Sequence, residues 1–441
     1  MTLRRCAGAT LAALVMLVPV LAPALGAEEA AAPEPKTTPE FGQEVMDLAR
    51  WQPLWDGKTL AGWHPIGKGD WAIEDGAIVG RHDAGEGEFG HLVTDAVYKD
   101  FVARLAYKSL KGNSGFYFRI EEKGASGVSG FQAEIDPRSD VGGLYETNGR
   151  AWVAQPTPDQ VATYFKPDDW NEMIVAALGR SLSVYVNGKP SAHVAADPGR
   201  LDGRIALQLH GGQEGLVYFK DLAIVPVTAL PAEPGLAGWK KPTGDWQIVG
   251  EAAQDPANEK ALAVKPGVGV LYNGPKGSTG NLFTEAEFGD IAAQIDFLIP
   301  KGSNSGVYFM GRYEIQVYDS YGVEKGEYPG IECGGIYERW KDDKGFEGHS
   351  PAVNASLPPG RWQRFEAIFR APRFGADGKK TANARFVKVY HNGQVVHENV
   401  ELTGPTRGAA FEDEKPAGPL MFQGDHGPVA YRNLRIVPLK D

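Results

Sequence analysis

The sequence predicts an all-β protein built from two antiparallel β-sandwiches in tandem. Three observations support this fold class. Apolar residues alternate with polar ones at a period of two in many short segments, whereas long helical periodicity is nearly absent. The chain contains 56 glycines and 31 prolines among 441 residues, an excess that suits the turns between many short strands. The motifs of the first half also recur in the second half in the same order.

The repeat has an almost constant offset along the chain. Asn113-Ser114-Gly115 recurs 191 residues later as Asn304-Ser305-Gly306. The segment Gly142–Glu146, with the sequence GGLYE, recurs 192 residues later as Gly334–Glu338, with the sequence GGIYE. Near-equal offsets for separate motifs indicate two copies of one domain. Each copy, with about 180 to 210 residues, is the right size for one sandwich.

The N-terminal 27 residues have the pattern of a secretory signal peptide. Arg4 and Arg5 precede a short apolar run that ends in small residues. The run is shorter than the roughly 20 apolar residues that a membrane span needs. We therefore expect cleavage of residues 1–27, no membrane span, and a periplasmic or secreted protein. The remaining organisation is predicted as a spacer at 28–49, a first copy at 50–228 and a second copy at 235–441.

Period-two alternation also places individual elements within the copies. Strands are predicted at Phe101–Tyr107, Met173–Ala177, Ser183–Val186 and Arg204–His210, and Asn187-Gly188 is typical of a hairpin turn. Short helices are expected at Glu44–Ala49 and Pro158–Phe165. The recurring tryptophans are expected in the cores, and these are Trp63, Trp71, Trp239 and Trp246.

Charge and missing motifs exclude several classes of function. The formal net charge of −11 has the wrong sign for an electrostatic nucleic-acid binder. The sequence has no Walker loop, nucleophile elbow, Cys-x-x-Cys or His-x-x-x-His, which argues against an NTPase, a serine esterase and a zinc hydrolase. We expect no cofactor. A divalent metal held by Glu and Asp stays an alternative, although no spacing of these residues in the sequence indicates a metal site. The residues carry no signal for an oligomeric state.

Four segments together resemble one family. They are Trp55–Trp63 (WDGKTLAGW), the Asn-Ser-Gly-x-Tyr-Phe segment, the Gly-Gly-x-Tyr-Glu segment, and Gln423–Gly427 (QGDHG). In combination they resemble the 3-keto-disaccharide hydrolase family. The resemblance covers both copies and implies two concanavalin-like jelly-roll sandwiches, related to those of glucanases and lectins. It also implies a secreted or periplasmic bacterial protein whose substrates are glycosides with a ketone at carbon 3 of the sugar.

Alternation assigns the candidate site residues to the open face of one sheet in each copy. In the second copy Ile315 and Val317 are expected between the sheets, which directs Glu314 and Gln316 outward. Carboxylate, amide, imidazole and phenol groups on one face suit the recognition of sugar hydroxyls, whereas the competing interpretation is an ordinary solvated face. The candidate catalytic residues are Glu314, His426 and Asp425 in the second copy and Glu134 and His210 in the first. The candidate substrate-binding residues are Gln316, Tyr308, Gln423 and Tyr337 in the second copy and Tyr117, Arg119, Gln132, Gln208 and Tyr145 in the first.

The chemistry expected at these residues differs from that of ordinary glucanases. The strand that would carry a glucanase Glu-x-Asp-x-x-Glu motif lacks it, so double displacement by two carboxylates is not expected. With the substrate that the resemblance implies, a single base would remove the acidified hydrogen at carbon 2. The candidate bases are His426 or Glu314 in the second copy and His210 or Glu134 in the first. The enolate would expel the group on carbon 1, and water would then add. Arg119, Tyr117 or Tyr308 would hold the enolate oxygen.

Two alternatives stay open at this point. The protein could be a non-catalytic, lectin-like carbohydrate-binding protein, because fold alone does not fix function. Alternatively, one copy is catalytic and the other binds. The second copy is then the favoured catalytic one, because Asp425 precedes His426 there, whereas no aspartate precedes His210.

Overall fold

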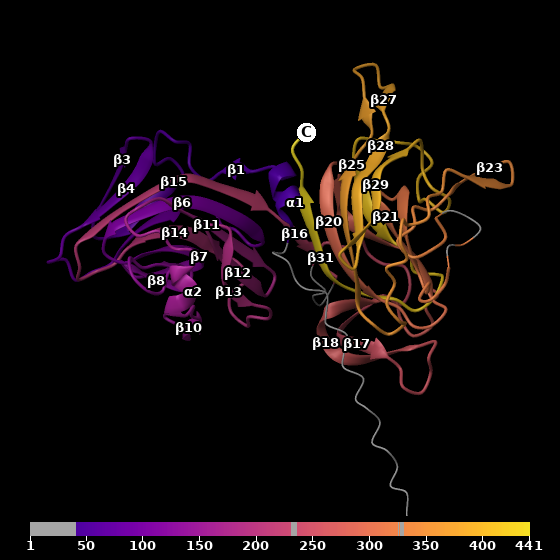
Figure 1. The fold of residues 1–441 in the computed structure, drawn as a ribbon, viewed down its shortest axis with the longest axis horizontal. Coiled ribbons are helices and arrows are strands. Elements are labelled where there is room, and N and C mark those ends of the chain that lie inside the picture. The colour runs from indigo at the N-terminus through magenta and orange to yellow at the C-terminus, as the bar shows by residue number, and fades with distance from the viewer. Residues whose placement is uncertain (1–40, 231–235, 325, 327–329) are drawn as a thin grey trace, which may run out of the picture. The chain divides into compact units, whose positions relative to one another are not determined.

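The computed structural model describes residues 41–230, 236–324, 326 and 330–441. The predicted signal peptide, and residues 28–40 of the predicted spacer, lie outside the described residues. The fold is all-β, as predicted, with two short helices and many antiparallel strands (Figure 1). No helix in the described part of the chain is long and apolar enough to cross a membrane.

The first sandwich, drawn in indigo and magenta in Figure 1, has two large antiparallel sheets. One sheet has the spatial order β13 (Lys189–Val194), β12 (Ser181–Val186), β11 (Asn171–Leu178), β6 (Phe101–Lys111), β15 (Gly215–Pro226), β4 (Ala77–His82) and β3 (Asp70–Glu74), with β1 (Gln52–Pro53) paired to β15. The other has the order β10 (Ala151–Ala154), β9 (Leu144–Thr147), β8 (Gly127–Ile135), β7 (Ser114–Lys123), β14 (Arg204–Leu209), β5 (Gly90–Thr94) and β2 (Trp63–Gly67).

The core of the first sandwich follows the alternation of its strands. Phe116 of β7, Ala133 of β8 and Leu207 of β14 are fully buried between the sheets. Because side chains alternate along a strand, their neighbours in sequence point to the other face of the same sheet. The predicted hairpin between β12 and β13 is confirmed, with positive φ at both Asn187 and Gly188.

The second sandwich, drawn mostly in orange and yellow in Figure 1, has one large sheet and one small one. The large sheet has the order β17 (Gln247–Gln254), β18 (Leu262–Tyr272), β31 (Ala430–Pro438), β20 (Ile291–Leu298), β25 (Gln363–Arg370), β28 (Ala384–His391) and β29 (Gln394–Leu402), with β16 (Thr228–Leu230) paired to β31. The small sheet has the order β19 (Leu282–Phe288), β30 (Gly418–Phe422), β21 (Asn304–Phe309) and β22 (Tyr313–Tyr318). Two short ribbons are formed by β23 (Arg339–Lys341) with β24 (Lys344–Phe346), and by β26 (Arg373–Phe374) with β27 (Lys380–Ala382).

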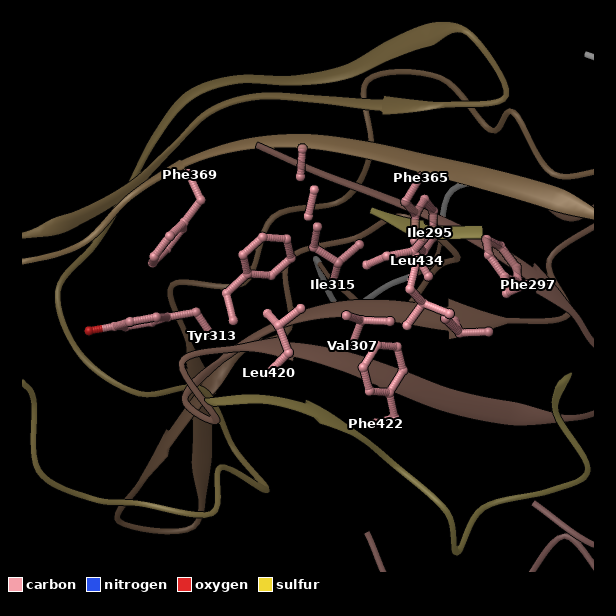
Figure 2. Packing of buried hydrophobic residues seen from close by; sticks show 14 of the residues in the cluster. Ile295, Phe297, Val307, Tyr313, Ile315, Phe365, Phe369, Leu420, Phe422 and Leu434 are labelled. Atoms are coloured by element: carbon pink, nitrogen blue, oxygen red, sulfur yellow. The ribbon is translucent and has the colours of Figure 1, made fainter. Parts of the chain in front are cut away.

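Large apolar side chains fill the space between these two sheets. Figure 2 shows Val307, Ile315 and Leu420 of the small sheet packed toward Phe365 and Phe369 of the large one. Burial of such side chains stabilises the fold by roughly 1.5–3 kcal/mol each. Since Ile315 points into this core, Glu314 and Gln316 on either side of it point to the opposite face, as alternation predicts.

The recurring tryptophans contribute to the cores as predicted. Trp63 belongs to the first core, and Trp239 and Trp246 belong to the second. Trp71 is partly buried, and its ring packs against Phe219 at the edge of the first core.

Both predicted helices are present, as α1 (Gln43–Leu48) and α2 (Pro158–Ala162). At α2 the side chains of Thr157 and Gln160 form a capping box. At α1 the Glu44 carboxylate accepts hydrogen bonds from Lys388 and Tyr390. Residues 41–49, which the sequence assigns to a spacer, are therefore part of the folded protein, because this helix has side-chain partners on β28.

Candidate functional site

Each sandwich has a pocket on the outer face of the sheet that contains the Asn-Ser-Gly strand. The first pocket has a volume of about 470 Å³ and lies over β7, β8, β9 and β14. It is lined by every first-copy candidate except Arg119, namely Tyr117, Gln132, Glu134, Tyr145, Gln208 and His210. The second pocket has a volume of about 350 Å³ and is lined by the second-copy candidates Tyr308, Glu314, Gln316, Tyr337, Gln423 and His426. Asp425 is hydrogen-bonded to His426 at the edge of this pocket.

The Asn-Ser-Gly motif builds the floor of the first pocket. Asn113 donates side-chain hydrogen bonds to Glu134 and, at 3.3 Å, to Asp136. The Ser114 hydroxyl donates to the carbonyl oxygen of Gln208 at 2.7 Å and so ties β7 to β14. Gly115 leaves room for Gln132, because a Cβ at residue 115 would lie 2.5 Å from Nε2 of that glutamine. The motif thus holds the candidate side chains in place.

The same motif builds the floor of the second pocket. The Ser305 hydroxyl donates to the carbonyl oxygen of Gln423 at 2.8 Å, which ties β21 to the chain after β30. A Cβ at Gly306 would lie only 2.1 Å from Oε1 of Glu314. Glycine is therefore required here because the glutamate side chain lies directly over the backbone of the neighbouring strand.

Both glutamates lie at the bottom of their pockets and are not on a solvated face. The exposed fraction is 5% for Glu134 and 2% for Glu314, so the competing interpretation of a solvated face is wrong for these two residues. Burial raises the pKa of each carboxyl group to about 8. A hydrogen bond from Asn113 to Glu134, and another from Tyr308 to Glu314, act in the opposite direction and lower the pKa. Near neutral pH each group can therefore either donate or accept a proton.

Strand register shows that the carboxylate and the amide exchange places between the two pockets. In the first pocket Glu134 pairs with Gly115, and in the second Gln316 takes the equivalent position opposite Gly306. Glu314 instead pairs with Tyr308. Positions two residues apart on a strand are about 7 Å apart. The two carboxyl groups would therefore meet different parts of a bound sugar.

The two histidines also have different partners. His426 contacts the carboxylate of Asp425, with 2.5 Å between Nδ1 and Oδ1. His210 contacts the carbonyl oxygen of Gly211 through its Nδ1 at 2.7 Å, and its ring packs edge-on against Phe89. A carboxylate stabilises an imidazolium ion, whereas a neutral carbonyl group does so less. Of these two histidines, only His426 has a carboxylate against its Nδ1.

Arg119 does not reach the first pocket, and this prediction is wrong. Its guanidinium is fully buried and donates hydrogen bonds to the carbonyl oxygens of Lys99 and Gly179 and to the Asp100 carboxylate. The reason is a register shift between β7 and β8 after Phe118, where Arg119 has a φ of +51°. The irregularity interrupts the alternation on which the prediction depends.

Arg407 is a functional candidate that sequence reasoning missed. It lines the second pocket, and its guanidinium stacks 3.8 Å from the ring centroid of Trp340. Its backbone N–H donates to the carbonyl oxygen of Glu338 at 2.8 Å, and one guanidinium nitrogen lies 3.9 Å from the Glu338 carboxylate. Arg407 lies in a loop without periodicity, so no alternation could place it. The described residues that line the first pocket include no lysine or arginine.

The first pocket also has aromatic walls that the sequence did not single out. Trp152 of β10 and Phe89 line it, in addition to the predicted Tyr145.

Within the described part of the chain, no cluster of three or more His, Cys, Asp and Glu side chains could hold a metal ion.

Comparison with known families identifies the domain that is repeated. A sequence profile described as the 3-keto-alpha-glucoside-1,2-lyase-like domain matches residues 50–225 and again residues 233–437. The chain belongs to this family. The two matched regions cover nearly all of the two sandwiches, so the resemblance expected from the motifs is confirmed for both copies of the 3-keto-alpha-glucoside-1,2-lyase-like domain.

Several solved structures are similar to part of this chain. A protein of Parabacteroides distasonis ATCC 8503, provisionally described as a glycosyl hydrolase, has 25% identity, with 49% of this chain and 86% of that chain covered and a TM-score of 0.36. The carbohydrate-binding module CBM66 of Bacillus subtilis has 19% identity and a TM-score of 0.30, and the match covers 36% of this chain and 93% of the module. A Bacillus subtilis protein of unknown function with a galectin-like fold has 13% identity and a TM-score of 0.32, and the match covers 40% of this chain and 94% of that protein. No curated protein sequence matches the chain.

Proposed function

We propose that this protein cleaves glycosides whose sugar ring carries a ketone at carbon 3, and that the pocket of the second sandwich performs the reaction. One observation carries the proposal: Glu314, His426 with its partner Asp425, and Arg407 belong to the same pocket. A buried acid, a carboxylate-supported histidine and a guanidinium are the three groups that an elimination next to a ketone requires.

In the first step, His426 removes a proton from carbon 2 of the sugar. The ketone at carbon 3 acidifies this hydrogen, and the electron pair of the broken C–H bond moves into an enolate. Because Nδ1 of His426 faces the Asp425 carboxylate, Nε2 is the nitrogen that accepts the proton. The negative charge on the enolate oxygen is stabilised by Arg407, whose guanidinium is held by Trp340 and Glu338.

In the second step, the bond between carbon 1 and the glycosidic oxygen breaks. The enolate electrons form a double bond between carbons 1 and 2, and the leaving oxygen takes a proton from Glu314. The raised pKa of about 8 keeps this carboxyl group largely protonated at neutral pH, as a general acid requires. Addition of water across the double bond then completes a net hydrolysis. The description of the family as lyase-like supports an elimination as the bond-breaking step.

The test is a comparison of matched substrates with the full-length protein. Incubation with pairs of native and 3-keto glycosides, followed by mass detection of released sugar, should give release only from the 3-keto member. His426→Ala should lower the rate by about a hundredfold or more, whereas the matched control His210→Ala should keep it. Release from native glycosides alone, or full activity of His426→Ala, would overturn the proposal.

We also propose that the protein is exported to the periplasm or the medium. The charged start, short apolar run and small residues at 1–27 support this. N-terminal sequencing of the protein recovered from the periplasm or medium should find a start near residue 28. Recovery of the intact N-terminus from the cytoplasm only would contradict export.

A further inference from the structure

We infer that the pocket of the first sandwich is a separate binding site for neutral, unoxidised oligosaccharides, which it holds without cleaving them. The inference stands independently of the reaction proposed for the second pocket. It depends on the hydrogen bonding, the aromatic walls and the charge of the first pocket.

Both oxygens of the Glu134 carboxylate are already occupied by amide donors. Asn113 donates to Oε1, and Gln132 donates to Oε2 at 2.8 Å. The amide of Gln132 also lies 3.3 Å from Oε1 of Gln208, whose own amide donates to the Tyr117 hydroxyl at 3.0 Å. A carboxyl group fixed in such a network serves to orient amides, and amides of this kind recognise sugar hydroxyl groups.

Exposed aromatic rings lie at both ends of the first pocket. Trp152 has an exposed fraction of 36% and packs edge-on against Tyr145, with 5.2 Å between the ring centroids. It also lies over Gly143, where an added Cβ would be 2.7 Å from the indole. Phe89, with an exposed fraction of 37%, directly precedes β5. Such rings offer apolar faces that can stack on the C–H faces of a pyranose.

The spacing of these rings favours an oligosaccharide over a single sugar. Four strands, β9, β8, β7 and β14, separate β10 from β5 in the sheet. At about 4.8 Å between neighbouring strands, β10 and β5 are roughly 24 Å apart. A ligand that contacts both Trp152 and Phe89 must therefore extend across the strands over several sugar units.

The charge of the pocket selects against acidic sugars. Asp140 lines it, and the described lining residues include no lysine or arginine that could neutralise this aspartate. His91 lies in the same lining, and burial lowers its pKa to about 4, so it is uncharged at neutral pH. A carboxylated or sulfated sugar would meet like charge here, whereas a neutral sugar would not.

The test is calorimetric titration of the full-length protein with unoxidised neutral oligosaccharides of several linkages, in parallel with uronate-containing oligosaccharides. We expect saturable binding of at least one neutral series without release of product, and no measurable binding of the uronates. Trp152→Ala and, separately, Phe89→Ala should each weaken this binding about tenfold. The matched control Trp170→Ala, which removes an indole that stacks with Lys220 on another face, should leave the affinity unchanged.

Three outcomes would overturn the inference. The first is that no neutral oligosaccharide binds. The second is that Trp152→Ala and Phe89→Ala bind with the same affinity as the wild-type protein. The third is cleavage of an unoxidised oligosaccharide that Glu134→Gln abolishes. Cleavage of 3-keto glycosides is measured separately, so a failure of the reaction proposed for the second pocket would be recognised as such.

Discussion

Nδ1 of His426 lies 2.5 Å from Oδ1 of Asp425, and this pair has no counterpart at His210. Adjacent residues in the sequence are thus arranged so that the aspartate fixes the orientation of the imidazole. The difference supports the proposal that the second pocket performs the reaction. It also leads to the first prediction.

Asp425→Asn should lower kcat for a 3-keto glycoside by about tenfold to a hundredfold and change KM little. The amide keeps the shape of the side chain but removes the charge that stabilises the imidazolium ion in the transition state. Steady-state kinetics of the variant and the wild-type protein measure this split. A rise in KM at constant kcat would instead assign Asp425 to substrate binding.

The pH dependence of cleavage should report the ionisation of Glu314. Its pKa is raised to about 8 by burial, so the protonated form that donates to the leaving group is lost as the pH rises through that value. We expect kcat to fall above about pH 8. Glu314→Gln should lower kcat at neutral pH and remove this alkaline limb. An alkaline limb that persists in the variant would show that another group titrates there.

The free energy of unfolding should fall as the pH rises from about 4.5 to about 8. Glu134 and Glu314 have raised pKa values of about 8 against an ordinary value of 4.5, so the folded protein binds more protons than the unfolded chain in this range. Their contribution is fully present below about pH 4.5 and is lost as the pH approaches 8. The double variant Glu134→Gln, Glu314→Gln should reduce this slope. Urea denaturation at several pH values measures it, and an unchanged slope would contradict the burial argument.

Arg407→Met should lower kcat by about a hundredfold or more. It removes the guanidinium that we propose stabilises the developing enolate, while the methionine keeps much of the apolar contact with Trp340. Arg407→Lys should recover part of the rate. As a matched control, Arg361→Met on a loop outside the pocket lining should keep full activity. A loss of rate in the control equal to that of Arg407→Met would indicate a general effect of charge.

Period-two alternation predicted much of the fold and of both pockets. It placed Ile315 and Val317 in the core and Glu314 and Gln316 on the other face, because pairing between β21 and β22 is regular. It failed at Arg119, where the register shift between β7 and β8 turns the side chain away from the pocket. Sequence alone cannot show such a shift, since it depends on how the two strands pair.

Two other features depend on tertiary structure in the same way. Arg407 reaches the second pocket from a loop, and only its packing against Trp340 and Glu338 places it there. The sequence already shows Gln132-x-Glu134 in the first copy and Glu314-x-Gln316 in the second, and the strand register adds that these positions are equivalent. The burial that raises the pKa of both glutamates likewise comes from the surrounding pocket walls.

The most direct test of the proposed reaction is cleavage of a 3-keto glycoside in deuterated water. Proton removal at carbon 2, elimination and addition of water predict one solvent deuterium at carbon 2 of the released 3-keto sugar, detected by mass spectrometry and NMR. Substrate and product incubated without enzyme, and with His426→Ala, supply the background exchange. Release of a sugar without deuterium beyond that background would contradict the account, because the bond at carbon 1 would then break without prior loss of the hydrogen at carbon 2.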